Sequence, residues 1–188
     1  MELHICHMYP DVLNLYGDRG NVLCMKKRLE WRGIACKVSG LPIGERAPLD
    51  KYDLFFIGGG QEFEQGLLLD DLRSGKGDDI KAAVEDGKAF LCVCGGYQLM
   101  GHSYETHEGE RFKFLGVLDL VTVGQKERMI GNFAFETEYG TVVGFENHSG
   151  RTKLGSGLAP LGQVIVGCGN NGPAGPEGPH YTNVFGAY

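Results

Sequence analysis

The chain has 188 residues, of which 42% are hydrophobic and 22% are charged, and its formal net charge is -6. This balance is typical of one compact globular domain with a full core, and it excludes a largely disordered chain. The acidic charge and the lack of a basic cluster argue against nucleic-acid binding. No apolar run reaches the ~18 residues of a membrane span, and residues 1–9 do not form a signal peptide.

The chain contains six cysteines. A chain of this length can build its core without disulfides, and nothing in it indicates secretion. We therefore expect a reducing cytoplasm, with core cysteines and one reactive thiol.

The first half of the chain alternates between strand and helix patterns. Strands are predicted at residues 1–7, 34–38, 54–57 and 89–93, and helices at residues 21–32, around Ile80 and Val84, and from about Gln98. Gly33 and Gly87 are suited to end the first two helices. This alternation predicts an α/β fold, a doubly wound and mostly parallel sheet with flanking helices, as in flavodoxin-like proteins.

Two glycine clusters follow two of the apolar strands. Residues 58–60 are three glycines, and Gly95 and Gly96 follow the strand at residues 89–93. Ligands of doubly wound sheets bind at the carboxyl ends of the strands. The sequence therefore predicts a site at residues 58–60 and 94–96.

The second half of the chain has a different pattern. Residues 117–145 hold short runs typical of strands and hairpins, and the Gly/Pro/Asn-rich residues 167–179 predict a loop. No internal repeat or domain boundary is visible, so residues 1–188 are predicted to be a single domain. The apolar run at residues 184–188 ends at Tyr188, and we expect that a natural C-terminal segment is missing after it.

Cys94 stands where a predicted strand turns sharply into a helix. A nucleophile at such an elbow projects above the sheet, and the helix N-terminus favours its thiolate. The N–H of Gly95 would be placed to hold an oxyanion. The alternative is that Cys94 is a buried core cysteine. Cys92 lies inside the strand and should be packed, and the C-x-C spacing disfavours a metal or redox pair.

The motif CGGYQ at residues 94–98 resembles the nucleophile motif of the triad-type (class I) glutamine amidotransferases, in the form used by the cobyric acid synthase-like group. IGGGQ at residues 57–61 resembles the oxyanion strand of that group. The motifs NLYGDRGN (14–21), RMIGN (128–132), FENH (145–148) and GNNG (169–172) are most similar to the GatD family, the glutaminase subunits of lipid II isoglutaminyl synthase. The resemblance covers nearly the whole chain.

The resemblance implies a role for each matching residue. Cys94 would attack the side-chain amide of L-glutamine, and the N–H groups of Gly60 and Gly95 would hold the oxyanion. Gln98 and Arg128 would bind the glutamine, with Arg128 suited to its carboxylate. Ammonia would leave, and water would hydrolyse the remaining thioester. The alternatives are that Arg128 is a solvated surface residue and that Gln98 lies on a helix surface.

The chain departs from the family at the general base. The resemblance places the triad histidine just beyond Tyr188, and none of the six histidines stands in that motif. His102 and His107 lie in a polar stretch and should be solvated, whereas His148 and His180 are expected in loops. The chain as given is therefore predicted to be weakly active or inactive. The third triad member would come from the partner subunit.

Residues 16–21 leave two interpretations open. They form either a loop near the active site or partner, or a turn in which Asp18 or Asn21 caps the following helix.

The sequence has no phosphate-binding loop or dinucleotide fingerprint, so no cofactor or metal is predicted on this chain. The resemblance implies a heterodimer with a MurT-like (Mur ligase-like) synthetase, which would bind ATP and amidate the stem-peptide glutamate of lipid II in peptidoglycan synthesis. Three rival hypotheses remain: an amidotransferase for another acceptor such as a corrinoid, a cysteine peptidase or γ-glutamyl hydrolase on the same fold, and an inactive binding subunit.

Overall fold

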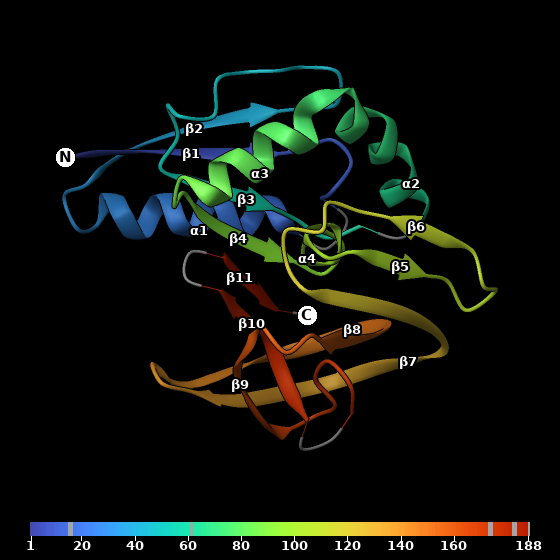
Figure 1. Ribbon diagram of the computed structural model, residues 1–188. Coiled ribbons are helices and arrows are strands. Elements are labelled where there is room, and N and C mark those ends of the chain that lie inside the picture. The colour runs from blue at the N-terminus through green and yellow to red at the C-terminus, as the bar shows by residue number, and fades with distance from the viewer. Residues whose placement is uncertain (15–16, 61, 173–174, 182–183, 188) are drawn as a thin grey trace. The chain divides into compact units, whose positions relative to one another are not determined.

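A computed structural model describes residues 1–14, 17–60, 62–172, 175–181 and 184–187 (Figure 1). The backbone divides into two compact units, Met1–Gly96 and Tyr97–Tyr188. Among the described residues, no helix is both long enough and apolar enough to cross a membrane.

The first unit is built on parallel strands. These are β1 (Glu2–Met8), β2 (Ala35–Leu41), β3 (Leu54–Ile57) and β4 (Ala89–Val93), in the order β2-β1-β3-β4. This order is that of a flavodoxin-like sheet, and the predicted strand ranges are close to the observed ones. The α/β prediction is confirmed.

The helices of this unit follow the strands. They are α1 (Asp18–Glu30), α2 (Glu62–Asp71), the π-helical turn η1 (Leu72–Lys76) and α3 (Gly77–Glu85), while α4 (Gly95–Met100) begins in this unit and continues into the second. Figure 1 shows α1 and α3 flanking the strands. Helix α1 begins three residues before the predicted start at residue 21, and α4 begins before Gln98. Helix α2 was not predicted, because Gly66 and three consecutive leucines interrupt any helical period.

Strands β3 and β4 carry the core of the first unit. Phe55, Phe56 and Ile57 of β3 are at most 1% exposed. The Phe55 and Phe90 rings stack with their centroids 4.6 Å apart. Apolar side chains on both faces of a strand are typical of parallel strands covered on both sides. This burial explains why both strands could be predicted from continuous apolar runs.

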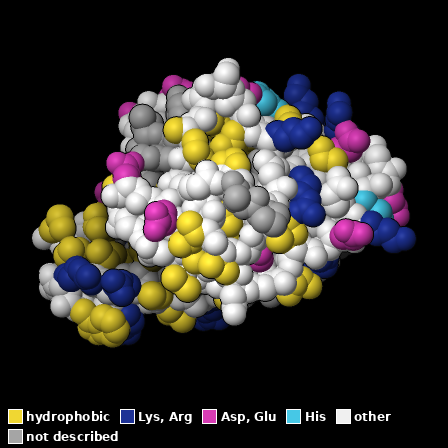
Figure 2. Space-filling model, turned by 90° about the horizontal axis from the view of Figure 1, so that it is seen from below, with side chains coloured by type: hydrophobic (Ala, Val, Ile, Leu, Met, Phe, Trp, Pro, Cys, Tyr) yellow, Lys and Arg dark blue, Asp and Glu magenta, His cyan; other side chains and the backbone are white. Residues whose placement is uncertain are grey.

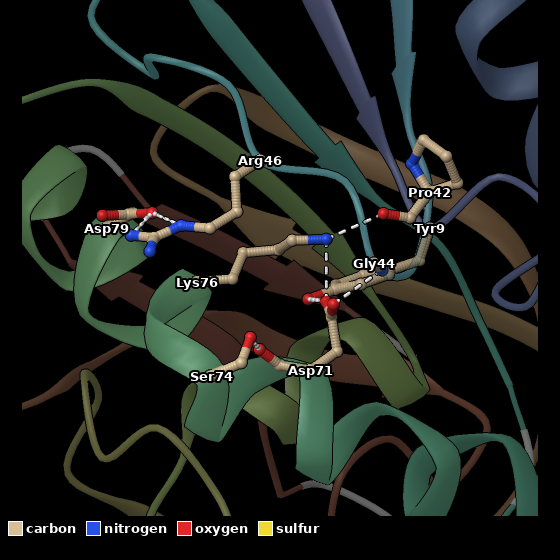
Figure 3. A network of polar contacts seen from close by, with 8 residues as sticks. All are labelled: Tyr9, Pro42, Gly44, Arg46, Asp71, Ser74, Lys76 and Asp79. Carbon is tan, nitrogen blue, oxygen red and sulfur yellow. Dashed lines mark hydrogen bonds and ion pairs between the residues drawn. The ribbon is translucent and has the colours of Figure 1, made fainter.

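A buried polar network lies just beyond the carboxyl end of β1 (Figure 3). The Lys76 ammonium is 2.7 Å from the Asp71 carboxylate and donates to the Pro42 carbonyl oxygen. The same carboxylate accepts the Tyr9 hydroxyl at 2.9 Å and the Gly44 N–H at 2.7 Å. Burial by itself would raise the pKa of Asp71, but the hydrogen bonds from Lys76, Gly44 and Tyr9 outweigh it, and the pKa is lowered. This network joins Tyr9, which directly follows β1, and the loop of Pro42 and Gly44 to Asp71 and Lys76 at the end of α2 and in η1.

The second unit is mainly antiparallel. Its strands are β5 (Ser103–Glu105), β6 (Arg111–Lys113), β7 (Leu120–Thr137), β8 (Gly140–Leu154), β9 (Ala159–Val166), β10 (Pro176–Tyr181) and β11 (Val184–Ala187). Their order is β11-β10-β9-β7-β5-β6, with β8 paired to β7, and only β5 and β7 run parallel among the pairs described. The predicted hairpin pattern of residues 117–145 is confirmed.

The loop predicted for residues 167–179 is partly wrong. Strand β10 begins at Pro176 and pairs with β9, with Pro176 opposite Gln163. Composition predicts local turn preference, whereas a strand depends on a neighbour that is distant in sequence. The glycine- and proline-rich residues therefore did not reveal it.

The sheet around β7 has one buried and one exposed apolar face. Phe133 and Phe135 of β7 pack with Val164 of β9 in a small core. The opposite face carries exposed apolar side chains from neighbouring positions of β7, β8 and β9: Ile130 (69% exposed), Val143 (77%), Phe145 (75%) and Val166 (52%). Figure 2 likewise shows hydrophobic side chains gathered in groups on the surface seen from below.

Replacing Lys76 with methionine should destabilise the protein. The Lys76 and Asp71 side chains are 1% and 5% exposed, and removing one partner of a buried pair costs about 3–5 kcal/mol. The lowered pKa of Asp71 means that this stabilisation is present above about pH 4, the unfolded carboxyl value, and is lost as pH falls through the folded-state pKa. Urea unfolding should therefore show a stability difference that is large at pH 7 and shrinks on acidification.

The matched control is Arg46→Met, which breaks the Arg46–Asp79 ion pair in the same part of the fold (Figure 3). That pair is 55% and 35% exposed, so its loss should cost at most about 1 kcal/mol. Equal losses in the two variants would contradict the importance of the buried pair.

Candidate active site

Cys94 occupies a strained turn between β4 and α4. Its φ angle is +49°, a left-handed conformation that costs a non-glycine residue about 1–3 kcal/mol. The residue is partly exposed. A strained, partly exposed cysteine between a buried strand and a helix has the geometry of a nucleophile elbow. The alternative of a buried core cysteine is therefore wrong.

Gly96 lets this turn approach the end of β3. Its N–H donates to the Gly58 carbonyl oxygen at 3.0 Å. A Cβ atom at Gly96 would lie 2.5 Å from the Ile57 carbonyl oxygen and 2.8 Å from the Gly58 carbonyl oxygen. Both obstacles are backbone atoms, which cannot rotate away. Only glycine fits here, and the two glycine clusters predicted to form one site do meet.

The other side of the Gly58–Gly59 segment contacts the start of α1. The Gly59 N–H donates to Asp18 Oδ1 at 2.9 Å. A Cβ atom at Gly58 would lie 2.3 Å from the Leu13 carbonyl oxygen and 2.7 Å from Asp18 Cγ. Asp18 is 1% exposed and is the first residue of α1, directly after the N-cap residue Gly17. Of the two interpretations of residues 16–21, the contact between Asp18 and Gly59 supports a segment near the candidate site. Leu15 and Tyr16 lie outside the described residues.

Two cysteines, Cys6 and Cys92, are buried in the core, unlike Cys94. Cys92 is fully buried, and burial raises the pKa of its thiol. Burial likewise raises the pKa of Cys6 to about 12. Both are inert core thiols, as predicted for Cys92. Among the described residues, no group of histidine, cysteine and acidic side chains could hold a metal ion.

Gln98 and Arg128 belong to the second unit. Gln98 is 5% exposed in α4, so the alternative of a helix-surface residue is wrong. Arg128 is exposed on β7, and its Nε and Nη2 donate to Asn147 Oδ1 at 3.0 and 2.9 Å. Nη2 also donates to the Asn147 carbonyl oxygen. These bonds hold the guanidinium in one orientation on the exposed surface. The role of Arg128 in binding glutamine stays a prediction.

Sequence reasoning did not assign a role to Glu146. This carboxylate is 3% exposed and accepts the N–H groups of Cys168 and Gly169 at 2.7 and 2.9 Å. It therefore fixes the start of the GNNG segment to β8. The sequence placed Glu146 in the FENH motif at residues 145–148, which indicates the family but does not identify the groups that the carboxylate binds.

The histidines are partly as expected. His102 and His107 are exposed, as predicted. His148 was expected in a loop, and this is wrong: it lies in β8, is 4% exposed, and its Nδ1 contacts the Gly150 carbonyl oxygen at 3.1 Å. Burial lowers the pKa of His148. His180 was also expected in a loop, and this is wrong: its backbone lies in β10 and pairs with Phe185 of β11. The side chain of His180 and the base predicted beyond Tyr188 lie outside the described residues.

Comparisons with known proteins agree with this geometry. Residues 4–188 match the sequence profile of the CobB/CobQ-like glutamine amidotransferase domain. The chain belongs to this glutamine amidotransferase family. Solved structures share its fold: PurLQS from Thermotoga maritima matches with a TM-score of 0.68 and 19% identity, covering 100% of this chain and 86% of that one. A second structure, described as a glutamine amidotransferase, matches with a TM-score of 0.66 and 17% identity, over 97% of this chain and 87% of that one.

Within this family, the chain is more similar to GatD subunits than to cobyric acid synthases. The chain is 42% identical to the GatD subunit of the glutamine-hydrolysing lipid II isoglutaminyl synthase of Staphylococcus aureus, over 100% of this chain and 76% of the relative. It is 40% identical to the corresponding GatD subunit of Streptococcus pneumoniae, over 100% of this chain and 73% of that protein. A cobyric acid synthase of Clostridium botulinum is 33% identical over 65% of this chain and 26% of its own length.

Replacing Gly96 with alanine should impair this amidotransferase. The new methyl group would push the turn away from β3, and a misplacement of about 1 Å can cost about 10²-fold in rate. Overpacking should also reduce stability by about 1–3 kcal/mol. Glutamine hydrolysis and thermal unfolding measure the two effects.

The matched control is Gly157→Ala, because a Cβ atom there meets nothing within 4 Å. This variant should keep wild-type activity and stability. Wild-type activity in Gly96→Ala would show that the close approach of the turn to β3 is not needed.

Proposed function

We propose that this chain is the glutaminase subunit of a lipid II isoglutaminyl synthase in peptidoglycan synthesis. The observation that carries the proposal is the strained Cys94 elbow, closed by Gly96 against Gly58, in a chain 42% identical over its whole length to a GatD subunit. The cobyric acid synthase relatives match a smaller part of the chain at lower identity. This difference favours lipid II over a corrinoid as the acceptor.

The reaction begins at the Cys94 thiolate. Its sulfur attacks the side-chain amide carbon of glutamine, and a tetrahedral oxyanion forms. The N–H groups of Gly60 and Gly95 hold this oxyanion. Gly60 follows the segment that Asp18 and Gly96 anchor, and Gly95 begins α4, where N–H groups have no acceptor within the helix.

Collapse of the intermediate releases ammonia and leaves a glutamyl thioester on Cys94. A base takes the thiol proton, donates it to the leaving ammonia, and then activates the water that hydrolyses the thioester. The proposal assigns this role to a histidine outside the described residues and the third triad member to the partner. The resemblance of its motif assigns Arg128 to the glutamine carboxylate, and the proposal keeps this role because the planar guanidinium suits a carboxylate. Gln98 contributes a further hydrogen bond to the substrate.

Amide formation on the acceptor needs a second protein. A carboxylate must be activated before ammonia can attack it, and we assign ATP and the stem-peptide glutamate of lipid II to a MurT-like (Mur ligase-like) partner in the cytoplasm. The curated relatives are themselves described as subunits. The exposed apolar face defined by Ile130, Val143, Phe145 and Val166 suits a partner that buries apolar area. We place the synthetase subunit on this face.

The test uses the chain extended past Tyr188 to include the predicted histidine, in complex with its synthetase, and ammonia release by this complex should depend on Cys94. Cys94→Ala should remove all measurable glutamine hydrolysis, because no other group supplies the nucleophile, whereas binding of glutamine should persist. Cys24→Ala, which removes an exposed thiol on α1, should leave the rate unchanged. Lipid II and a corrinoid acid are offered as acceptors, and amidation of the corrinoid alone would contradict the proposed acceptor.

The exposed apolar face can be tested separately. Phe145→Asp places a charge on a side chain that is 75% exposed, so folding should be unchanged while association with the synthetase weakens by about tenfold or more. Trp31→Asp is the matched control, because Trp31 is 77% exposed at the end of α1. Isothermal titration gives the dissociation constants, and equal effects of the two variants would move the interface elsewhere.

A further inference from the structure

Asp18 is a buried carboxylate that the proposed reaction does not use. It is 1% exposed and begins α1. A charge is costly to bury unless it makes hydrogen bonds, so its position calls for a partner that needs it. That partner is the N–H of Gly59, which donates to Asp18 Oδ1 at 2.9 Å.

The bond is made to a peptide group that is held from two sides. The Gly58 carbonyl and the Gly59 N–H belong to the same planar trans peptide, so they point in opposite directions. The carbonyl accepts the Gly96 N–H at 3.0 Å, and the N–H reaches Asp18. The result is a chain of hydrogen bonds from the Cys94 turn, through one peptide, to the carboxylate.

Two features make this peptide sensitive to Asp18. The Gly58–Gly59 peptide links two glycines, and the glycine backbone has more conformational freedom than that of any other residue. Without hydrogen bonds to its neighbours, this peptide could therefore rotate. The Asp18 side chain also packs directly on Gly58, where a Cβ atom would lie 2.7 Å from Asp18 Cγ and 2.8 Å from Asp18 Cβ. A negative charge at one end of a hydrogen-bonded chain strengthens the bond at the other end.

We propose that Asp18 is a positioning residue, which fixes the Gly58–Gly59 peptide and thereby orients the N–H of Gly60 toward the oxyanion formed at Cys94. The inference rests on the proposed function of Gly60. It gives the GDRG segment at residues 17–20 a role in the rate of the reaction, in addition to its role in starting α1. Asp18 itself does not touch the substrate.

The test uses the complex with the synthetase subunit and three variants. Asp18→Ala removes the acceptor, Asp18→Ser keeps a polar residue suited to a helix start but is too short to reach Gly59, and Asp18→Asn retains Oδ1 as a neutral acceptor. Asp78→Ala is the matched control, because Asp78 is an acidic residue in the first turn of α3 whose side chain is 87% exposed.

Asp18→Ala and Asp18→Ser should lower kcat for glutamine hydrolysis by about 10²-fold, the effect of losing one oxyanion donor. KM should change by less than about threefold, because the lost contact acts in the transition state. Asp18→Asn should recover most of the rate. Alkylation of Cys94 by iodoacetamide needs only the thiolate, so its rate should be unchanged in all variants.

Hydrogen exchange at the Gly59 N–H, the group that donates to Asp18 Oδ1, gives a readout that does not depend on activity. Exchange should accelerate by more than about tenfold in Asp18→Ala and Asp18→Ser, and remain slow in Asp18→Asn and Asp78→Ala. If Asp18→Ala does not fold, the Asp18→Ser variant decides.

Wild-type kcat and unchanged exchange in Asp18→Ser would overturn the inference, as would a loss of melting temperature with no loss of kcat. If the wild-type complex releases no ammonia that depends on Cys94, the proposed function fails instead. The exchange rates then still decide whether Asp18 holds this peptide.

Discussion

The close approach of the Cys94 turn to the end of β3 is the constraint on which the candidate site depends. A nucleophile elbow is strained, and Cys94 has a φ angle of +49°. Such strain persists only when the surroundings hold the turn in place. Here the hydrogen bond from Gly96 to Gly58, and the absence of a side chain at Gly96, bring the turn against β3. The thiol and the Gly58–Gly60 segment therefore reach the same edge of the parallel sheet.

The turn that follows β1, residues 9–13, packs against the same edge of the sheet and stabilises it. Tyr9 follows β1 directly and its carbonyl oxygen accepts the N–H groups of Val12 and Leu13. The Leu13 carbonyl in turn packs on Gly58. The Tyr9 hydroxyl is held by Asp71 and its ring lies beneath the Lys76 ammonium. The buried network thus stabilises a turn that contacts the glycine segment, which links the stability of the fold to the geometry of the site.

Much of the first unit could be predicted from local patterns. Strands β3 and β4 were predicted with their observed bounds, because strands covered on both faces are continuous apolar runs. Both runs end in glycines, and the two glycine clusters that the sequence predicted to come together do meet, through Gly96 and Gly58. The π-helical turn Leu72–Lys76 with its kink at Gly75 was not predicted, and neither was the buried Lys76–Asp71 ion pair that spans it. In the second unit, β10 escaped detection because its proline- and glycine-rich residues become a strand only by pairing with β9.

The sequence by itself determined the family, and it predicted Cys94 as the nucleophile and the need for glycine near it, because these follow from short contiguous motifs. The tertiary structure alone decided which groups support them. Asp18 and Gly59 are separated by 41 residues, and Glu146 and Cys168 by 22. A carboxylate that accepts a distant backbone N–H leaves no periodic or spacing signal in the sequence. Its partner is set by how strands and helices pack, and that packing exists only in the folded chain.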